Sequence, residues 1–225
     1  MDLKQAISER HSVRIYENRP LGKEIETELN DFISELNGES GLKIQLITGE
    51  PKAFDCFMAH YGKFSGVTDY FALVGGKGDA EKCGYYGEKL VLFAQTLGLN
   101  TCWTAISYKK QPQALIMAPG DKLFIVIATG YGLTNGTAHR SKDISKLIKS
   151  DGAAPEWFSE GAKAAALAPT AINRQKFLLE YHSDGTVSAS YSSSLGKKLG
   201  RIDLGIIKLH FEIGSGKDSS VWRLK

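Results

Sequence analysis

The strongest constraint on this chain is a proline-containing turn late in the sequence, residues 168–175, which read Ala-Pro-Thr-Ala-Ile-Asn-Arg-Gln. The small residues of 162–167 before it are typical of a helix, and the apolar run 177–181 after it is typical of a strand. Because proline cannot continue a helix, the chain must turn at Pro169. An ordinary loop between a helix and a strand is the simplest interpretation of this stretch alone.

The same turn also offers groups that suit a bound ligand. Thr170 and Ala171 are small enough to let a flat molecule approach the backbone, and Asn173 has both an amide donor and an acceptor. A second stretch near the N-terminus, residues 9–16, reads Glu-Arg-His-Ser-Val-Arg-Ile-Tyr and places two arginines around a serine. Solvated cations at a helix end would be the simpler interpretation of that stretch alone.

Taken together, the two stretches resemble the FMN-dependent nitroreductase family. Its first motif, Arg-Arg/His-Ser-x-Arg/Lys, is matched at Arg10, His11, Ser12 and Arg14. Its second motif, Ala-Pro-Ser-x-x-Asn-x-Gln-Pro-Trp, is matched at Ala168, Pro169, Asn173 and Gln175, with Thr170 in place of Ser and Lys176-Phe177 in place of Pro-Trp. Residues 98–103, Gly-Leu-Asn-Thr-Cys-Trp, resemble a third family segment, Gly-Leu-Gly-x-Cys-Trp.

The resemblance implies an FMN site and assigns its contacts by position. Arg10 and Ser12, with His11 beside them, would hold the phosphate, since a guanidinium forms paired charge-assisted hydrogen bonds. Either Arg140 or Lys142 would supply a further phosphate contact. Arg14 would face the pyrimidine edge of the ring and stabilise its reduced form. The remaining cofactor-binding positions are Trp103, Thr104, Pro169, Thr170, Ala171 and Asn173.

The chemistry implied by the resemblance is carried by the flavin, and the sequence offers neither a catalytic triad nor a metal cage. NAD(P)H would deliver a hydride to the flavin N5 and then leave, and a small-molecule electron acceptor, nitroaromatic or quinone-like, would be reduced next. Two alternatives stay open. One is another flavin chemistry on the same fold, such as dehalogenation or dehydrogenation. The other is a flavin-binding protein without turnover, for storage or sensing, because Pro-Trp is missing after Gln175.

The chain is expected to form an α+β fold made of two similar halves, 1–150 and 151–225, with mixed or antiparallel sheets flanked by helices. Family members form the flavin site between two identical subunits, whereas this chain has the first motif in one half and the second motif in the other. The two halves would therefore be fused subunits that mimic the dimer, with Gly84 and Gly205 at matching positions. We expect one FMN per chain and a monomer that can form the site alone.

Apolar periodicity and turn residues predict the individual elements. Helices are expected over 2–10, 20–36, 51–61, 79–97 and 155–167 and through 202–213, and a helical turn over 144–148. Asn37-Gly38 is expected to end the second helix. Strands are expected over 42–46, 70–74, 123–128, 177–182 and 187–191, with a type I′ turn at Asp184-Gly185 joining the last two.

Composition limits the class of partner and the compartment. A formal net charge of +3 with scattered cations does not favour nucleic acid. No apolar run approaches the roughly 20 residues of a membrane span, and the charged N-terminus does not resemble a signal peptide, so a cytoplasmic location is expected. The three cysteines form no close pair and are expected to be reduced and mostly buried.

Overall fold

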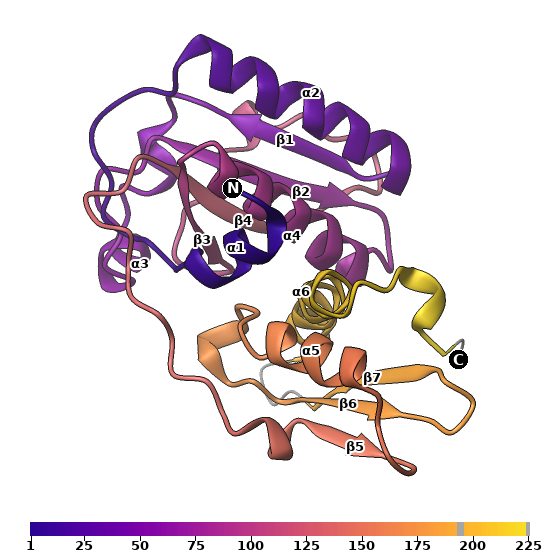
Figure 1. Ribbon diagram of the computed structural model, residues 1–225. Helices are drawn as coiled ribbons and strands as arrows, with labels where there is room; N and C mark the ends of the chain where they lie inside the picture. The colour runs from indigo at the N-terminus through magenta and orange to yellow at the C-terminus, as the bar shows by residue number, and fades with distance from the viewer. Residues whose placement is uncertain (193–195, 224–225) are drawn as a thin grey trace.

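The computed structural model describes residues 1–192 and 196–223. The first part of the molecule is a four-stranded antiparallel sheet with the strand order β1-β2-β4-β3. Its strands are β1 (Lys43–Ile47), β2 (Asp69–Gly75), β3 (Asn100–Thr104) and β4 (Lys122–Gly130). The helices of this part are α1 (Leu3–Glu9), α2 (Lys23–Ser40), α3 (Phe57–Tyr61) and α4 (Ala80–Thr96), as Figure 1 shows.

Both faces of this sheet are buried, and alternate residues along each strand serve the two faces. Phe71 and Leu73 of β2 belong to a cluster that includes apolar residues of α2 and α4. Tyr70 and Ala72 belong to a second cluster with Phe54 and other residues of the 53–67 region. A strand buried on both sides is nearly continuously apolar, and this explains why β2 carries no alternating polar face.

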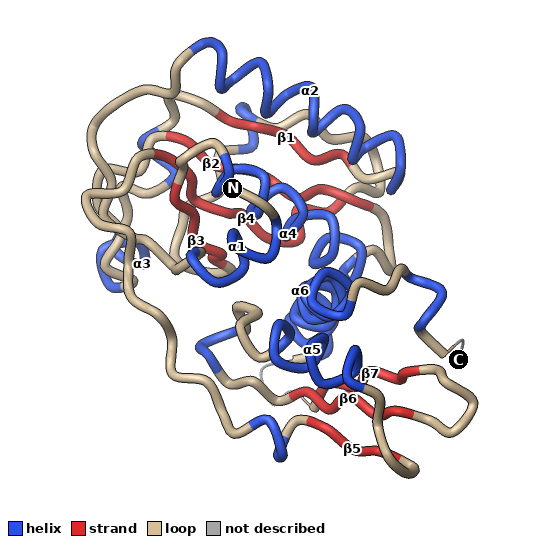
Figure 2. Tube along the Cα trace, viewed as in Figure 1, coloured by secondary structure: helices blue, strands red, loops and turns tan. Residues whose placement is uncertain are grey.

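The second part of the molecule is a three-stranded sheet with the order β5-β6-β7, in which β5 is parallel to β6 and β7 is antiparallel to it. Its strands are β5 (Ile148–Ser150), β6 (Phe177–Tyr181) and β7 (Val187–Tyr191), and its helices are α5 (Glu156–Ala165) and α6 (Lys197–Ser215). A long connection leaves β4 and runs along one side of the molecule to β5 (Figure 2).

The two parts meet where α4 and α6 cross, and α6 lies between the two sheets (Figure 1). A Cβ atom on Gly84 would lie 1.9 Å from the carbonyl oxygen of Ile202, and one on Gly205 would lie 2.0 Å from that of Glu81. Gly84 therefore contacts Ile202, three residues before Gly205, and Gly205 contacts Glu81, three residues before Gly84. Two backbones in contact at this distance leave no space for any side chain, so glycine is required at both positions.

The mixed α+β fold expected from the sequence is confirmed, and several element boundaries are corrected. The expected helix over 51–61 is broken into a 3₁₀ turn (Pro51–Ala53) and α3, with residues 54–56 outside both. Helix α2 continues past Gly38 and ends before Gly41, whose φ of 71° suits a glycine cap. Asn37 pairs through its side chain with both backbone groups of Ile44 instead of ending the helix.

Two further corrections concern the second part. The expected helical turn over 144–148 is a 3₁₀ turn (Ile144–Lys146) followed by strand β5, whose carbonyls and amides pair with β6. The turn between β6 and β7 is closed by the Gly185 N–H donating to the carbonyl of His182. Within that turn only Gly185 has a positive φ, so the expected type I′ turn, which needs two, is wrong.

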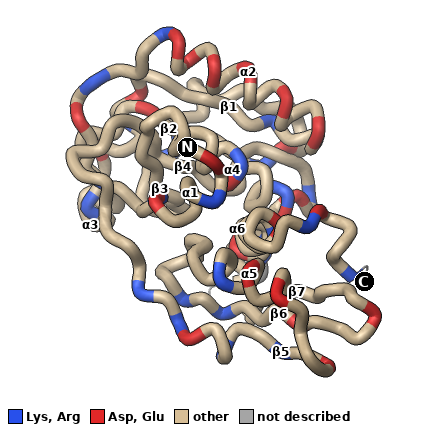
Figure 3. The backbone as a smooth tube through the Cα atoms, viewed as in Figure 1, with Lys and Arg blue, Asp and Glu red and all other residues tan. Residues whose placement is uncertain are grey.

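Charges of both signs are distributed over both parts, with acidic residues gathered along α2 (Figure 3). All three cysteines are free, and Cys83 and Cys102 are buried, as expected. Within residues 1–192 and 196–223, no helix has the length and apolarity needed to cross a bilayer.

We predict that Gly205→Ala destabilises the fold by about 1–3 kcal/mol or more, because its Cβ would overlap the α4 backbone. Gly38→Ala is the matched control. This glycine lies inside α2 with nothing within 4 Å of an added Cβ, so alanine should stabilise it by up to about 1 kcal/mol. Urea unfolding of both variants checks this. Equal free energies of unfolding for the two variants would contradict the crossing contact.

Candidate functional site

The first motif begins at the end of α1, where the backbone leaves the helix and runs beside β3. Arg10 caps α1 with an extended backbone conformation, at φ −68° and ψ 120°. Ser12 then bridges to Thr101 of β3, and the Val13 N–H donates to the Thr101 carbonyl at 3.0 Å. Val13 and Tyr16 are buried in the core, and this fixes the register of the motif against the sheet.

Arg10 is not a solvated cation, because its side chain is buried between the two parts of the molecule. It is 3% exposed, and its Nε lies 3.7 Å from Oε1 of Glu88 on α4. Glu88 is itself fully buried and accepts a hydrogen bond from Nε1 of Trp103 at 2.8 Å. Its Oε1 lies 2.8 Å from Nε2 of His210 on α6, which is also fully buried. We call Arg10, Glu88, Trp103 and His210 the buried charged cluster.

The buried charged cluster carries one net positive charge. Nδ1 of His210 lies 3.2 Å from the carbonyl oxygen of Ala164, which can only accept, so Nδ1 holds a proton. A second proton lies between His210 Nε2 and Glu88 Oε1, because two unprotonated atoms would not approach to 2.8 Å. Whichever of these two atoms holds it, the His210–Glu88 pair is neutral as a whole, and the charge of Arg10 is left over.

Arg10 also has unused hydrogen-bonding groups. Its Nε and Nη1 are buried and find no hydrogen-bond partner within residues 1–192 and 196–223. Leaving a buried charged donor unpaired is costly, and an anionic ligand would supply both the charge and the acceptors. His139 lies nearby, with Nε2 3.1 Å from the Ala166 carbonyl, and burial together with the positive charge of Arg10 lowers its pKa although that hydrogen bond raises it.

The second motif forms a loop with unusual backbone conformation. Ile172, Asn173 and Gln175 all have positive φ, at 48°, 52° and 46°. Non-glycine residues rarely adopt this region, and a β-branched residue such as Ile172 does so at a cost of roughly 1–3 kcal/mol. Such strain persists only where surrounding contacts hold it, and it gathers at ligand sites.

Gln175 supplies those contacts and joins the loop to the segment 139–142. It is 2% exposed, its Oε1 accepts from the backbone N–H of Lys142 at 2.8 Å, and its Nε2 donates to the Arg140 carbonyl at 2.9 Å. The side chain of Asn173 lies in the same network, because Nδ2 donates to the Arg140 carbonyl and Oδ1 accepts from Gln175 Nε2. The amide of Asn173 is therefore engaged inside the loop.

A buried carboxylate on α6 holds the start of the loop. Both carboxylate oxygens of Asp203 lie 3.1 Å from the backbone nitrogen of Ala171. Burial raises the pKa of Asp203 to about 6, although hydrogen bonds from Tyr191 and from the Ala171 N–H lower it. The Thr170 hydroxyl completes the loop by accepting from the Gln175 N–H at 3.0 Å.

The remaining expected site residues differ in whether their side chains are free to contact a ligand or are already bonded within the protein. Lys142 is engaged, because its Nζ donates to the Gln175 carbonyl at 3.0 Å. Arg140 is exposed, and its guanidinium forms no hydrogen bond or ion pair with any residue that the structure describes. Arg14 is exposed, with its guanidinium carbon 6.0 Å from the centre of the Phe64 ring. Thr104 is buried and accepts from the Ser107 N–H.

The structure thus joins segments that are far apart in sequence. Ser12 bridges to Thr101 of β3, and His11 packs against Gly136 at the start of the connection that carries His139. His139 contacts the end of α5, and Pro169, Thr170 and Ala171, which follow α5, are half-buried. The first motif, the 139–142 segment and the 168–175 loop therefore form one continuous region.

Sequence reasoning missed Glu88, His210, Asp203 and the role of Gln175. A signal was present for the first three, because each is a charged or titratable residue on an otherwise apolar stretch of a helix. Such residues are rarely buried without a partner. Glu88 and His210, however, are 122 residues apart in sequence, and Asp203 is 32 residues from Ala171, and a single sequence does not reveal those pairings.

Comparisons with solved structures find the same fold. A "putative nitroreductase" from Thermotoga maritima is 22% identical with a TM-score of 0.66, covering 95% of this chain and 83% of that one. A "putative nitroreductase in complex with FMN" from Desulfovibrio desulfuricans is 20% identical with a TM-score of 0.51, covering 65% and 95%. A "nitroreductase-like protein" from Streptococcus mutans is 12% identical with a TM-score of 0.53, covering 63% and 94%.

A search of curated proteins gives no match. A family model described as "Putative TM nitroreductase" matches residues 2–215, which is nearly the whole chain. The segments that carry the motif resemblance, the buried charged cluster and the strained loop all lie within the matched range. The chain therefore belongs to this nitroreductase family.

Proposed function

We propose that this protein binds FMN and acts as an NAD(P)H-dependent oxidoreductase that reduces a nitroaromatic or quinone-like acceptor. The observation that carries the proposal is Arg10, a buried arginine whose Nε and Nη1 have no hydrogen-bond partner in the described part of the chain. A phosphate would meet those donors and that charge together. The FMN complex of the Desulfovibrio desulfuricans relative supports the choice of flavin.

The phosphate would be held by Arg10, with His11 and Ser12 beside it. Of the two further candidates, Arg140 is favoured over Lys142. The guanidinium of Arg140 is exposed and has no partner in the described part of the chain, whereas the ammonium of Lys142 is already bound to the Gln175 carbonyl. A guanidinium also matches a phosphate with two parallel hydrogen bonds, which an ammonium cannot form.

The ring side would be formed by residues from both parts of the molecule. Trp103 and Thr104 at the end of β3 would supply one wall, together with Arg14. Pro169, Thr170 and Ala171 would supply the facing one, and Asn173 would contribute by holding the loop shape through its bonds to Arg140 and Gln175. A positive charge from Arg14 near the pyrimidine edge would favour the reduced ring.

FMN, when bound, supplies hydride acceptance and donation at its ring. The residues of this chain would place the ring and exclude water from one of its faces. The strained loop suits this role, because Asp203 and Gln175 fix its backbone before any ligand arrives, so little ordering entropy remains to be lost on binding.

A second candidate function is flavin binding without turnover, for storage or sensing. The observation that favours it is the replacement of Pro-Trp by Lys176-Phe177 after Gln175. Phe177 is buried in the main core as the first residue of β6 and pairs with Tyr191. It therefore does not take the place of a ring-side tryptophan.

We further propose that the halves 1–150 and 151–225 are fused counterparts of two subunits. The support is the reciprocal contact at Gly84 and Gly205, which is the pattern that a two-fold axis imposes on identical subunits. Strand β5 lies just before the proposed boundary and pairs with the second sheet. A counterpart of the first motif is missing before Pro155, so a single flavin site is proposed per chain.

The experiment that tests the function is purification followed by flavin analysis and anaerobic reduction. We expect a yellow monomer with one FMN per chain, and bleaching of the flavin when NADPH or NADH is added. Absorbance with protein concentration, mass spectrometry of the released flavin and light scattering give these results. A yellow protein that stays oxidised supports the binding function. FAD, two flavins per chain, or flavin bound only by a dimer would reject the proposal as stated.

We predict that Arg10→Ala weakens FMN binding by about 1.5–3 kcal/mol, the range for a hydrogen bond to a charged group, or roughly 10- to 150-fold in Kd. Lys4→Ala is the control, because Lys4 is an exposed cation on α1. Titration of flavin-free protein measures both affinities. Circular dichroism of the flavin-free variant checks that it folds. An unchanged Kd in a folded Arg10→Ala protein would remove Arg10 from the site.

We predict that Asp203→Asn becomes more stable relative to the parent protein as pH rises from about 4 to about 7. The folded-state pKa of about 6 lies above the ordinary 3.8, so the stability that this group contributes is present below about pH 4 and is lost as pH rises through about 6. The gain should reach up to about 3 kcal/mol. Urea unfolding at the two pH values measures it.

Asp184→Asn is the control, because its stability relative to the parent protein should change with pH in the opposite direction. Hydrogen bonds from Thr186 lower the pKa of Asp184, so its contribution to stability is lost as pH falls, and the variant should lose stability relative to the parent as pH rises. A stability difference between Asp203→Asn and the parent that does not change with pH would contradict the buried, charged state of Asp203.

A further inference from the structure

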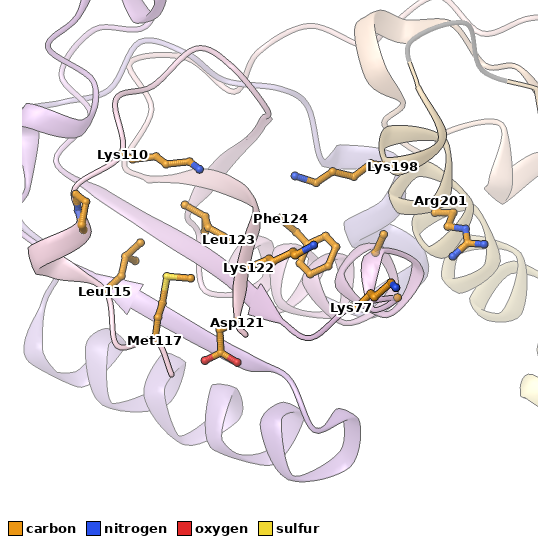
Figure 4. Close-up of a pocket in the computed structure, with 13 residues that line it drawn as sticks. Lys77, Lys110, Leu115, Met117, Asp121, Lys122, Leu123, Phe124, Lys198 and Arg201 are labelled. Atoms are coloured by element: carbon orange, nitrogen blue, oxygen red, sulfur yellow. The ribbon is translucent and has the colours of Figure 1, made fainter. Parts of the chain in front are cut away.

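A cavity lies at the junction of the two parts, at the N-terminal ends of α4 and α6 (Figure 4). Its volume of 720 Å³ falls within the range of about 300–1,000 Å³ that is typical of small-molecule sites. Lys77, just before α4, and Lys198, in the first turn of α6, both line it. They lie seven positions before Gly84 and Gly205, the glycines of the helix crossing. The cavity therefore lies to one side of the crossing and takes residues from both parts.

This cavity is separate from the proposed flavin site, and none of the expected FMN contacts lines it. The two sites lie at opposite ends of β4. Lys122, the first residue of β4, lines the cavity, whereas Thr129 pairs with Thr101, the partner of the first motif. Seven residues of strand separate them, or about 23 Å at a rise of about 3.3 Å per residue.

Cations dominate the polar groups of the cavity. Lys77, Lys110, Lys122, Lys198 and Arg201 all line it, and Asp121 is its one acidic residue within the described chain. The Asp121 carboxylate is already engaged, because Oδ2 lies 2.7 Å from Nζ of Lys43, which is not a lining residue, and accepts from the Ala118 N–H. The positive charge of the cavity is therefore not neutralised by its own acid.

The lysines crowd one another. Lys110 and Lys198 extend toward each other from opposite sides of the opening, with Lys122 close to them (Figure 4). Burial lowers the pKa of Lys198, and so does the charge of Lys110 and Lys122. Like charges held this close repel, and an anion bound between them would turn that repulsion into attraction.

The floor of the cavity is apolar, which narrows the class of ligand. Leu115, Met117, Leu123 and Phe124 line it. The Lys198 Nζ lies 5.4 Å from the centre of the Phe124 ring, so a cation and an aromatic face are already adjacent. An inorganic anion would use only the lysines, whereas a ligand with a flat apolar part would use the floor as well.

We propose that this cavity binds a small phosphorylated ligand with a flat ring, of the nucleotide class, with its phosphates between Lys110, Lys122 and Lys198 and its ring on the floor near Met117 and Phe124. The site takes residues from both parts of the molecule, so occupancy links them. The binding needs no flavin, since the cavity shares no lining residue with the proposed FMN site.

The test is calorimetric titration of the full chain with the flavin that it carries after purification and with no free FMN, because free FMN is itself a phosphorylated ligand with a flat ring. The probes are ADP, adenosine and pyrophosphate at low ionic strength. We expect one ADP per chain, bound more tightly than either fragment, with an affinity that falls as salt is added. Lys110→Gln/Lys198→Gln should weaken ADP binding about 10-fold or more, because each lysine supplies a charge-assisted contact.

Two further variants keep the test selective. Met117 is 41% exposed, so Met117→Ala should leave the fold intact and weaken ADP binding while pyrophosphate binding is unchanged. Lys4→Gln, an exposed cation on α1, should leave ADP binding unchanged. Failure to bind ADP, equal affinity for ADP and pyrophosphate, equal weakening by Lys4→Gln, or release of the bound flavin by ADP would each overturn the proposal. Flavin content, read by absorbance in the same samples, reports separately on the flavin site.

Discussion

The contact on which the rest of the structure depends is the crossing of α4 and α6 at Gly84 and Gly205. With no side chain between them, the two backbones approach until each glycine touches a carbonyl of the other helix. This closeness places Glu88, one turn after Gly84, within hydrogen-bonding distance of His210 on the partner helix. The contact therefore brings together the two sheets and also Glu88 and His210. A side chain at either crossing glycine would push the two helices apart and separate these two residues.

Burying those charged groups has a cost that packing alone does not explain. Two apolar side chains in place of Glu88 and His210 would fill the same space without desolvating an ion pair, and such replacements are often neutral or stabilising. The cluster instead holds Arg10 at the end of α1, and the Nε and Nη1 of Arg10 have no hydrogen-bond partner in the described chain. The orientation of Arg10 is therefore set by its neighbours, as its proposed contact to a phosphate requires.

Much of the fold could be predicted from local sequence, because apolar period and turn residues are local signals. The long helices and most of the strands followed from these signals, although β3 and β5 were not expected as strands. Membership of the nitroreductase family followed from segments such as 9–16 and 168–175. The break in the expected 51–61 helix could not be seen, since tertiary packing of Phe54 beside Phe64 and Tyr70 decides it. The proposed site was located by motif, but the partners of Arg10 were not, because Glu88 and His210 reach it through long-range contacts.

The crossing glycines also provide a common frame in which the two helices can be compared position by position. Two residues before each glycine stand Lys82 and Asp203, of opposite charge. Lys82 donates through Nζ to the carbonyl of Ser40, the last residue of α2, and Asp203 accepts from the N–H of Ala171 after α5. A dimer of identical subunits must use one residue type for both tasks. In a single chain the two positions can carry different residues. The end of α2 is therefore held by an ammonium and the loop after α5 by a carboxylate, and either residue can change without changing the other.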